Sequence, residues 1–470
     1  VEAAIEHASP DDLRTLLGRL PSGHRQRLFA AIRPSSARPP LIAADIAAGQ
    51  RHRCLADLPK AHLHLHLPAA IRRSRFEQAV SEHITSDESF LKLIVAELEE
   101  QAERDAGREG AARKADQHRR RAAWLSSGCP YPACLDSSNL ACFDAAMPQK
   151  GLVWDIQFAS KLLLERVPGD GVSKRLLQQT VMDLANDAQA ESILHAEVMA
   201  GFTPFSAADT AATCLAAAKK WESLFEARRL ALLKYPNFSL MYVVAIPREC
   251  MTAVQAEQMI QALQSTCGYD SSAVAGVGYF CGESRLHQYA GAFALFRQAG
   301  YRLVCVHAGE GEPSAGKGVE YISQAMNAGA ERIGHGIEAI HDEMLIEQLR
   351  LHRICLEVCP LSNRALECCP CVTSSTELAH CQSESEGLAQ HPLPRLLRAG
   401  VECTLNADDP LYWAAVEDGA HGLLREYNAC RDCMGLDDAA LALMADASFV
   451  HSSAPDEVVR RGREGIRTWL

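Results

Sequence analysis

The stretch 401–410 carries two adjacent carboxylates at the end of an apolar run. Its first residues are mostly apolar or β-branched, which favours a buried strand, and Asp408 and Asp409 follow before Pro410. Proline has no backbone N–H to donate, so strand pairing should end at this point. An unpaired buried charge is costly, so carboxylates at the end of a buried strand need a partner. The pattern therefore predicts a cation facing these two acids.

A run near residue 60 alternates histidine with leucine. Leu63 and Leu65 separate the three histidines His62, His64 and His66. Successive side chains of a strand point to opposite faces, so the imidazoles should share one face, about 7 Å apart along the chain. Neighbouring imidazoles at this spacing can bind the same metal ion. We therefore predict a strand that supplies histidine ligands to a metal.

Two further strand-like runs contain residues that suit a metal site. One run leads into His307 and Glu310, and the other contains His335. Combining His64, His66 and His307 with an aspartate gives neutral imidazoles and one carboxylate. Such a set, without a thiolate, suits zinc with one position left open for water. Zinc in this setting can lower the pKa of water to about 7 and so supply hydroxide at neutral pH.

The same groups suggest how protons would move during a reaction. Glu310 lies three residues after His307 and is placed to move a proton to the substrate. His335 and Asp408 can hold and orient the water, and Asp409 can form a hydrogen bond at the edge of a bound ring. The residues thus predict a zinc site that activates water.

These residues can meet only if the fold brings distant strand ends together. Eight strand-like runs alternate with helical patterns such as 208–234 and 338–351. The expected strands cover about 61–67, 193–199, 238–246, 274–280, 302–307, 332–335, 353–359 and 401–406. This alternation predicts an α/β fold, a TIM-like (β/α)8 barrel with additional helices, whose functional residues lie at the C-terminal strand ends. An open doubly wound sheet is the alternative, but no glycine-rich phosphate loop follows the first strand.

The rest of the chain predicts additions to this barrel. Residues 1–50 have a helical pattern with an apolar stripe and include the proline-rich linker 33–40. We expect this N-terminal helical extension to pack on the main domain or on a second subunit, which would make a homo-oligomer. Residues 51–470 should form the barrel domain. Within it, residues 72–165 have the pattern of a largely helical, charged insertion or lid.

Composition narrows the classes of function. The net charge of −12 argues against a general nucleic-acid or anionic-membrane binder. No apolar run of roughly 18 residues predicts a membrane span, and the first residues do not form a signal peptide, so we expect a cytoplasmic protein. A structural zinc site is conceivable from the spacing of Cys430 and Cys433, or within 368–381. We favour cysteine-rich surface loops for both groups.

Five stretches together resemble the motifs of the adenosine deaminase family of metal-dependent hydrolases. They are Pro-Lys-x-x-Leu-His-x-His-Leu (59–67), His-Ala-Gly-Glu (307–310), Arg-Ile-Gly-His-Gly (332–336), Glu-Val-Cys-Pro-x-Ser-Asn (357–363) and Leu-Asn-x-Asp-Asp-Pro (405–410). The resemblance implies a barrel, one Zn²⁺ per chain and a small-molecule aminopurine substrate. The reaction would be hydrolytic loss of ammonia from an adenosine-like 6-aminopurine nucleoside or nucleotide, which leaves the 6-oxopurine.

The same resemblance implies a role for each matching residue. The zinc ligands would be His64, His66, His307 and Asp408. Glu310 would protonate the ring nitrogen N1, and His335 would stabilise the attacking hydroxide. Substrate contacts would come from Asp409, at N7 of the purine, and from Gly282 and Glu283 after the fourth strand.

The chain also departs from the family pattern. His62 stands where the first motif usually has an acid, and Pro68 stands where an aspartate normally helps to hold the ribose. On the fourth strand, Gly278 or Tyr279 replaces another aspartate. The hydrolytic groups are therefore present while the substrate pocket differs. A nucleotide, a modified adenine nucleoside or another aminopurine is the expected alternative to adenosine.

Three other functions compete with this interpretation. A different barrel hydrolase would often hold two metals bridged by a lysine on the fourth strand, and residues 274–283 contain no lysine. His195 and Glu197 resemble half of a cytidine-deaminase zinc motif, but its Pro-Cys-x-x-Cys half is missing, so we interpret them as strand residues. The third alternative is a binding or regulatory protein that keeps the metal site without turnover.

Overall fold

The computed structural model describes residues 53–86, 171–201, 210–246, 253–280, 283–311, 317–366, 384–412 and 421–470, with isolated positions between 95 and 164. The predicted extension at 1–50, most of the predicted insertion at 72–165 and the cysteine group at 368–381 therefore lie outside the described residues.

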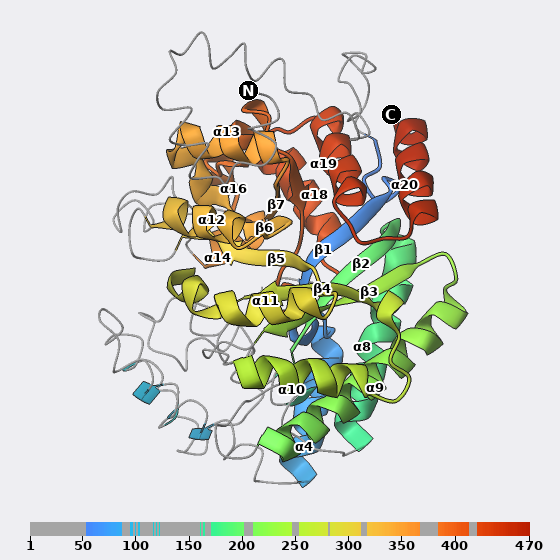
Figure 1. Ribbon diagram of the computed structural model, residues 1–470. Helices are drawn as coiled ribbons and strands as arrows, with labels where there is room; N and C mark the ends of the chain where they lie inside the picture. Colours follow the sequence, from blue (N-terminus) through green and yellow to red (C-terminus); the bar gives the residue numbers. More distant parts are fainter. Residues whose placement is uncertain are drawn as a thin grey trace.

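Eight parallel strands form one sheet whose order follows the sequence, with helices around it (Figure 1). The strands are β1 (Lys60–His66), β2 (Ile193–Ala200), β3 (Ser239–Ile246), β4 (Val274–Tyr279), β5 (Leu303–Ala308), β6 (Arg332–His335), β7 (Cys355–Val358) and β8 (Cys403–Leu405). Every expected strand is present, and the prediction of a (β/α)8 barrel is confirmed.

The barrel closes where the chain after β8 returns to β1, and Asp408 makes this closure. A parallel bridge joins Leu65 to Asp408. The Asp408 N–H donates to the carbonyl of His64 at 3.1 Å, and the His66 N–H donates to the carbonyl of Asp408 at 3.0 Å. The side-chain oxygen of Asn406 accepts two further N–H groups of β1. The seam of the barrel therefore lies among the residues predicted to bind metal.

Helices cover the outside of the strands in sequence order, so that α8 packs on α9, α9 on α10 and α10 on α11. The longer helices are α4 (Arg73–Ser86), α8 (Gly171–Ala190), α9 (Thr210–Lys234), α10 (Ala253–Gln264), α11 (Ala290–Gln298), α12 (Gly318–Asn327), α13 (Glu343–His352), α18 (Leu423–Met434), α19 (Asp438–Val450) and α20 (Asp456–Trp469). Figure 1 shows α19 and α20, in red, beside the blue strand β1, so the end of the chain covers its first strand.

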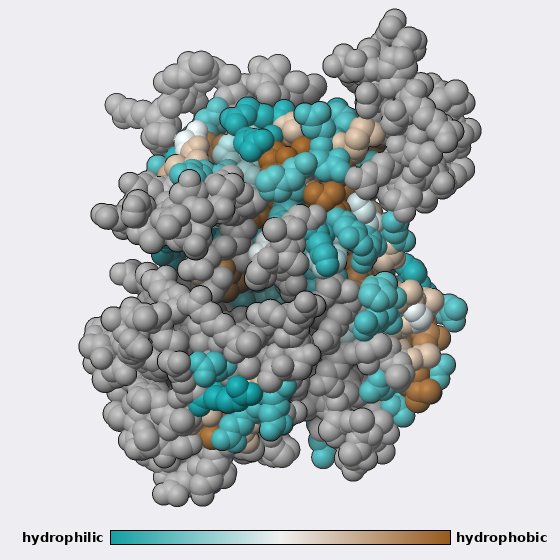
Figure 2. Space-filling view, turned by 90° about the vertical axis from the view of Figure 1, so that its left-hand side faces the viewer, coloured by the Kyte–Doolittle hydropathy of each residue, from teal (hydrophilic) through white to brown (hydrophobic). Residues whose placement is uncertain are grey.

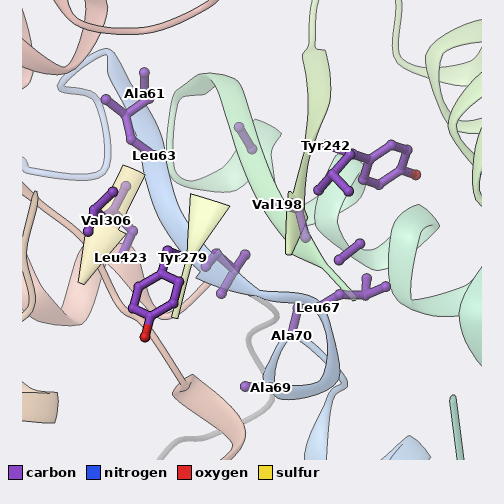
Figure 3. Packing of buried hydrophobic residues seen from close by; sticks show 14 of the residues in the cluster. Ala61, Leu63, Leu67, Ala69, Ala70, Val198, Tyr242, Tyr279, Val306 and Leu423 are labelled. Carbon is purple, nitrogen blue, oxygen red and sulfur yellow. The ribbon is translucent and has the colours of Figure 1, made fainter. Parts of the chain in front are cut away.

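The core forms between the strands and the helices. Strand β4 is buried along its whole length, as expected for a parallel sheet covered on both faces. Figure 3 shows side chains from several strands in one cluster, among them Leu63, Val198, Tyr242 and Val306. A smaller buried cluster contains Met199, Val243, Ala275, Val304 and Cys305.

The outer surface carries few large hydrophobic side chains among the described residues. Those exposed are Leu230, Leu233 and Val254, on α9 and α10. The face in Figure 2 is mostly hydrophilic where the structure describes it, with small hydrophobic patches between polar residues. Within the described part of the chain, no helix is both long enough and apolar enough to span a bilayer.

The prediction of a cysteine-rich surface loop at residues 430–433 is wrong. Cys430 and Cys433 both lie on helix α18, where Cys430 is fully buried and Cys433 partly buried, and both are free thiols. Because the apolar face of α18 packs on the core, Cys430 acts as a small hydrophobic residue. Neither cysteine belongs to a group of potential metal ligands among the described residues.

Candidate active site

The C-terminal ends of four strands bring imidazoles and carboxylates to one rim of the barrel. His64 and His66 come from β1, His307 from β5 and His335 from the end of β6. The ring centres of His64 and His307 lie 4.6 Å apart, and those of His307 and His335 lie 4.9 Å apart. Residues separated by more than 200 positions in the sequence therefore form one cluster.

Asp408 completes this cluster from the turn after β8. Its Oδ1 lies 3.3 Å from His64 Nε2 and 3.1 Å from His66 Nε2. Its Oδ2 accepts a hydrogen bond from the Ser362 hydroxyl at 2.6 Å. The φ angle of Asp408 is 60°, in the left-handed region that costs a non-glycine residue about 1–3 kcal/mol. The backbone bonds to β1 hold it in this conformation.

Four buried polar atoms converge at the rim without a hydrogen-bond partner among the described residues. They are Nε2 of His64, His307 and His335, and Oδ1 of Asp408. The ligand atoms of the three histidines lie within 4.8 Å of one another, as do those of Glu310, His335 and Asp408. Buried polar atoms are normally paired, so converging orphan atoms fit a cation. Imidazole nitrogens with a carboxylate are the ligand chemistry of zinc.

Burial sets the protonation of the groups around this point. Burial lowers the pKa of His307 well below its usual range, and the nearby His64 and His335 lower it further. Burial also raises the pKa of Glu310 well above its usual range, with Asp408 and Glu283 adding to the effect. This upward shift of the pKa favours the protonated carboxyl of Glu310, which is the form that a general acid needs.

The carboxylate of Glu283 supports the turn that carries Glu310. It accepts the N–H of Gly309 at 2.7 Å and the N–H of Glu310 at 2.9 Å. Gly309 has a φ of 71°, and a Cβ there would lie 2.4 Å from the side chain of Ile322, so the turn requires glycine. Glu283, predicted to contact substrate, is thus placed under this turn. Gly282 lies outside the described residues, and Asp409 follows Asp408 at the rim.

A buried ionic network lies behind His64. Nδ1 of His64 lies 2.8 Å from a carboxylate oxygen of Glu357, which also accepts a hydrogen bond from Cys305. Arg332 donates to Glu357 and reaches across to Glu197, at 2.6 Å. A carboxylate behind a histidine orients its other nitrogen toward the site. Sequence analysis interpreted Glu197 as a strand residue, which is correct, but it missed this network. The only feature of the sequence that could have indicated this network is the presence of Glu197 and Glu357 within apolar strands.

His62 does not join the cluster, although it was expected to share a face with His64 and His66. Its Nδ1 lies 3.1 Å from Nδ1 of His421, and its Nε2 accepts the Ala407 N–H at 3.1 Å. The pairing of β1 with β2 shifts register between His62 and Leu65, so the simple alternation of faces fails here. His421 gave no signal in the sequence.

The position of the expected acid on the fourth strand is taken by an aromatic ring. A Cβ on Gly278 would lie 2.3 Å from the ring of Phe280. The Phe280 ring centre is 5.3 Å from that of His66 and 5.0 Å from that of His307. Pro68 is buried in the short 3-10 helix Leu67–Ala69 that follows β1. Both departures from the family pattern therefore lie beside the histidine cluster.

Parallel (β/α)8 barrels with histidines and carboxylates at the C-terminal rim form a large class of metal-dependent hydrolases. Within that class, residues 173–469 match the family model of adenosine deaminase. The chain belongs to this family, as its motifs predicted, and it is a hydrolase that acts on C–N bonds of cyclic amidines. The matched segment starts at residue 173, so β1 with its three histidines precedes it.

Two relatives and two solved structures illustrate the similarity. An adenine deaminase of Cupriavidus metallidurans is 29% identical over 293 residues, which cover 61% of this chain and 72% of that protein. An adenine deaminase of Streptomyces coelicolor is 34% identical over 176 residues, 37% of this chain and 42% of that protein. The structure of adenine deaminase from Arthrobacter aurescens matches with a TM-score of 0.55 and 20% identity, over 88% of this chain and 99% of that one. An amidohydrolase from Burkholderia ambifaria with bound Zn matches with a TM-score of 0.57 and 16% identity, over 91% and 95%. The solved structures support the fold.

Proposed function

We propose that the protein catalyses the zinc-dependent hydrolytic deamination of a 6-aminopurine. Water is consumed, the 6-amino group leaves as ammonia, and the 6-oxopurine remains. The observation that carries the proposal is the convergence of unpaired buried Nε2 atoms of His64 and His307 with Oδ1 of Asp408. Family membership supplies the reaction class.

We assign the ligands to His64, His66, His307 and Asp408, as the resemblance to the family implies. A zinc ion held by them supplies the Lewis acidity that makes water a nucleophile at neutral pH. Glu310, whose pKa burial raises well above its usual range, gives its proton to N1 of the ring while oxygen attacks C6. His335 is assigned to the attacking oxygen, and its Nε2 lies 3.5 Å from Glu310 and 3.8 Å from Asp408. Asp409 is assigned to N7 at the edge of the purine.

The number of metal ions is proposed to be one per chain. A second metal would need a ligand from β4 near His66 and His307, and Phe280 fills that space. Strand β4 also offers no lysine to bridge two ions. The alternative of a two-metal barrel hydrolase is therefore disfavoured.

Free adenine is the first substrate candidate. The relatives from Cupriavidus and Streptomyces are named adenine deaminases. In addition, Pro68 offers no acceptor at the position where the family resemblance places a ribose contact. A nucleotide is the second candidate, because the structural matches include an N6-methyl-AMP deaminase of Arabidopsis, with a TM-score of 0.53 and 17% identity.

A substrate panel tests this proposal. The zinc-loaded protein is incubated with adenine, adenosine, AMP and N6-methyl-AMP, and the release of ammonia or methylamine is measured beside the zinc content. We expect one zinc per chain and fastest release from adenine. Zinc-loaded protein that releases amine from no member of the panel would favour a binding protein without turnover. Two zinc ions per chain would instead favour the other barrel hydrolases.

A further inference from the structure

We infer that His391 is a positioning residue that acts through Asn363 to fix His335 as a hydrogen-bond donor into the site. The inference rests on the proposed function and deepens it, because it decides which group can accept a proton during the reaction. His391 belongs to none of the motifs in the sequence. It precedes helix α17 (Leu393–Arg398) and is buried.

The hydrogen bonds that link His391 to His335 start at a backbone N–H, which can act only as a donor. The backbone N–H of Leu393 donates to Nδ1 of His391 at 3.1 Å. A backbone N–H can only donate, so this Nδ1 carries no proton. A neutral imidazole has one proton, which must then be on Nε2 of His391. That nitrogen lies 3.4 Å from Oδ1 of Asn363 and donates to it.

The amide of Asn363 then determines which atom donates in the next hydrogen bond, to His335. Since its oxygen faces the His391 donor, its NH₂ group faces Nδ1 of His335, at 3.1 Å. The amide therefore donates to His335, and Nδ1 of His335 is an acceptor without a proton. The remaining proton of neutral His335 is on Nε2. Amide orientations and histidine tautomers are usually ambiguous, but here a backbone amide fixes all three.

The fixed proton points at the reacting position. Nε2 of His335 is buried, has no hydrogen-bond partner among the described residues and lies near Glu310 and Asp408. The hydrogen bond from Asn363 to the opposite nitrogen limits rotation of the ring. Burial lowers the pKa of His391 to about 3, so this ring is neutral at pH 7 and carries the single proton that the hydrogen bonds require.

This arrangement gives His335 a defined task. It donates its Nε2–H to the attacking oxygen and orients a lone pair of that oxygen toward C6. It has no lone pair on this side, so it does not remove the proton of the water. The proton of the water is left to the carboxylate of Asp408, while Glu310 donates its own proton to N1. His391 is not one of the proposed metal ligands, and it acts by setting the direction of the Asn363 amide.

Two substitutions interrupt the hydrogen bonds between His391, Asn363 and His335 in different ways. In Asn363→Asp the carboxylate accepts from both histidines, which draws the His335 proton to Nδ1 and turns a lone pair into the site. In His391→Leu the amide of Asn363 loses its partner and can turn over. Loss of one preorganised donor costs about 10²–10³-fold in kcat. We expect a loss of this size in Asn363→Asp and a smaller one in His391→Leu, with KM and zinc content little changed.

The matched control is His391→Gln. Its amide carries both an acceptor for the Leu393 N–H and a donor for Asn363, so it should restore most of the kcat that His391→Leu loses. A merely structural role for His391 would predict equal losses in kcat for the two variants, or a loss of zinc with each.

The deciding measurement is the ring ¹⁵N spectrum of the holoenzyme labelled at histidine, with the His335 signals assigned by their absence in His335→Gln. We expect Nε2 to be protonated and Nδ1 bare in the wild type, and the reverse in Asn363→Asp. A wild-type signal with the proton on Nδ1 would overturn the inference, even if the variants fail to fold. The spectrum needs no turnover, so it tests the hydrogen bonds from His391 through Asn363 to His335 separately from the deaminase activity.

Discussion

Single residues at the rim have three proposed roles: metal ligands, a proton donor and groups that hold these residues in place. Glu310 is the proposed proton donor, because burial and its acidic neighbours raise the pKa of its carboxyl well above the usual range and Glu283 fixes the turn on which it stands. Replacing it by Gln removes the proton but keeps the shape. We expect Glu310→Gln to lower kcat by about 10²–10⁴-fold, the usual contribution of a general acid.

The control for this variant is its metal content. Glu310 is not among the assigned ligands, so zinc per chain should equal that of the wild type. A variant that loses both zinc and activity would move Glu310 into the ligand set. A variant with full activity would contradict its role as proton donor.

The buried pair His62 and His421 shows that the sequence pattern did not reveal the partner of a histidine. His62 was predicted from alternation to face the metal, yet it accepts the Ala407 N–H, and its partner His421 donates to the carbonyl of Leu184 at 2.8 Å. This pair therefore anchors the turn that carries Asp408. The alternation of histidine and leucine could not reveal this role, because the register shift and the partner both depend on the closed barrel.

At the scale of elements, the barrel seam and the helix ends carry the site. Glu191 follows α8, and its carboxylate accepts the N–H of Leu424 in the first turn of α18, at 2.7 Å. Burial raises the pKa of Glu191 from 4.5 to about 7. The folded state thus retains a proton that the unfolded state releases, so the stabilisation is complete below about pH 4.5 and is lost as the pH rises to about 7.

This linkage predicts a pH-dependent difference between the wild type and Glu191→Gln. Glutamine cannot titrate, so the free energy of unfolding of the wild type should fall relative to the variant by up to about 3 kcal/mol between pH 4.5 and 7. Urea unfolding of both proteins across this range measures the difference, and groups that titrate in both cancel. Parallel curves would contradict the raised pKa of Glu191.

Element positions were the part of the fold that local patterns predicted best. All eight strands were expected within a few residues, because buried parallel strands give short apolar runs that end in turns or polar residues. Helix α18 shows the limit of this approach. Cys430 and Cys433 suggested a loop by their type, whereas the neighbouring apolar residues Leu423 and Tyr427 bury one face of a helix.

At the scale of the whole molecule, zinc is expected to stabilise the fold as well as the reaction. The proposed ligands come from β1, β5 and the turn after β8, so an ion bound by them would join the seam of the barrel to its opposite side. Binding to the folded state alone adds about 4 kcal/mol at a ligand concentration 1,000 times the Kd. We expect chelation to lower the melting temperature by several degrees and to abolish turnover.

Readdition of zinc should restore the melting temperature and the turnover. Magnesium, which prefers oxygen ligands, should restore neither. Thermal unfolding followed beside metal analysis is the measurement. A melting temperature that stays constant after the zinc has been removed would show that the cluster is held by the protein alone and would weaken the ligand assignment.

The amino-acid sequence by itself determined the strands, the barrel and the residues that could bind a metal, because burial and strand ends follow from local patterns of residue type. The tertiary structure alone decided which of those residues meet. His62 turns to His421, Arg332 joins Glu197 to Glu357, and His391 reaches His335 through Asn363. Such contacts depend on how the strands register when the barrel closes, and hydrogen-bond direction is set by partners far away in the chain.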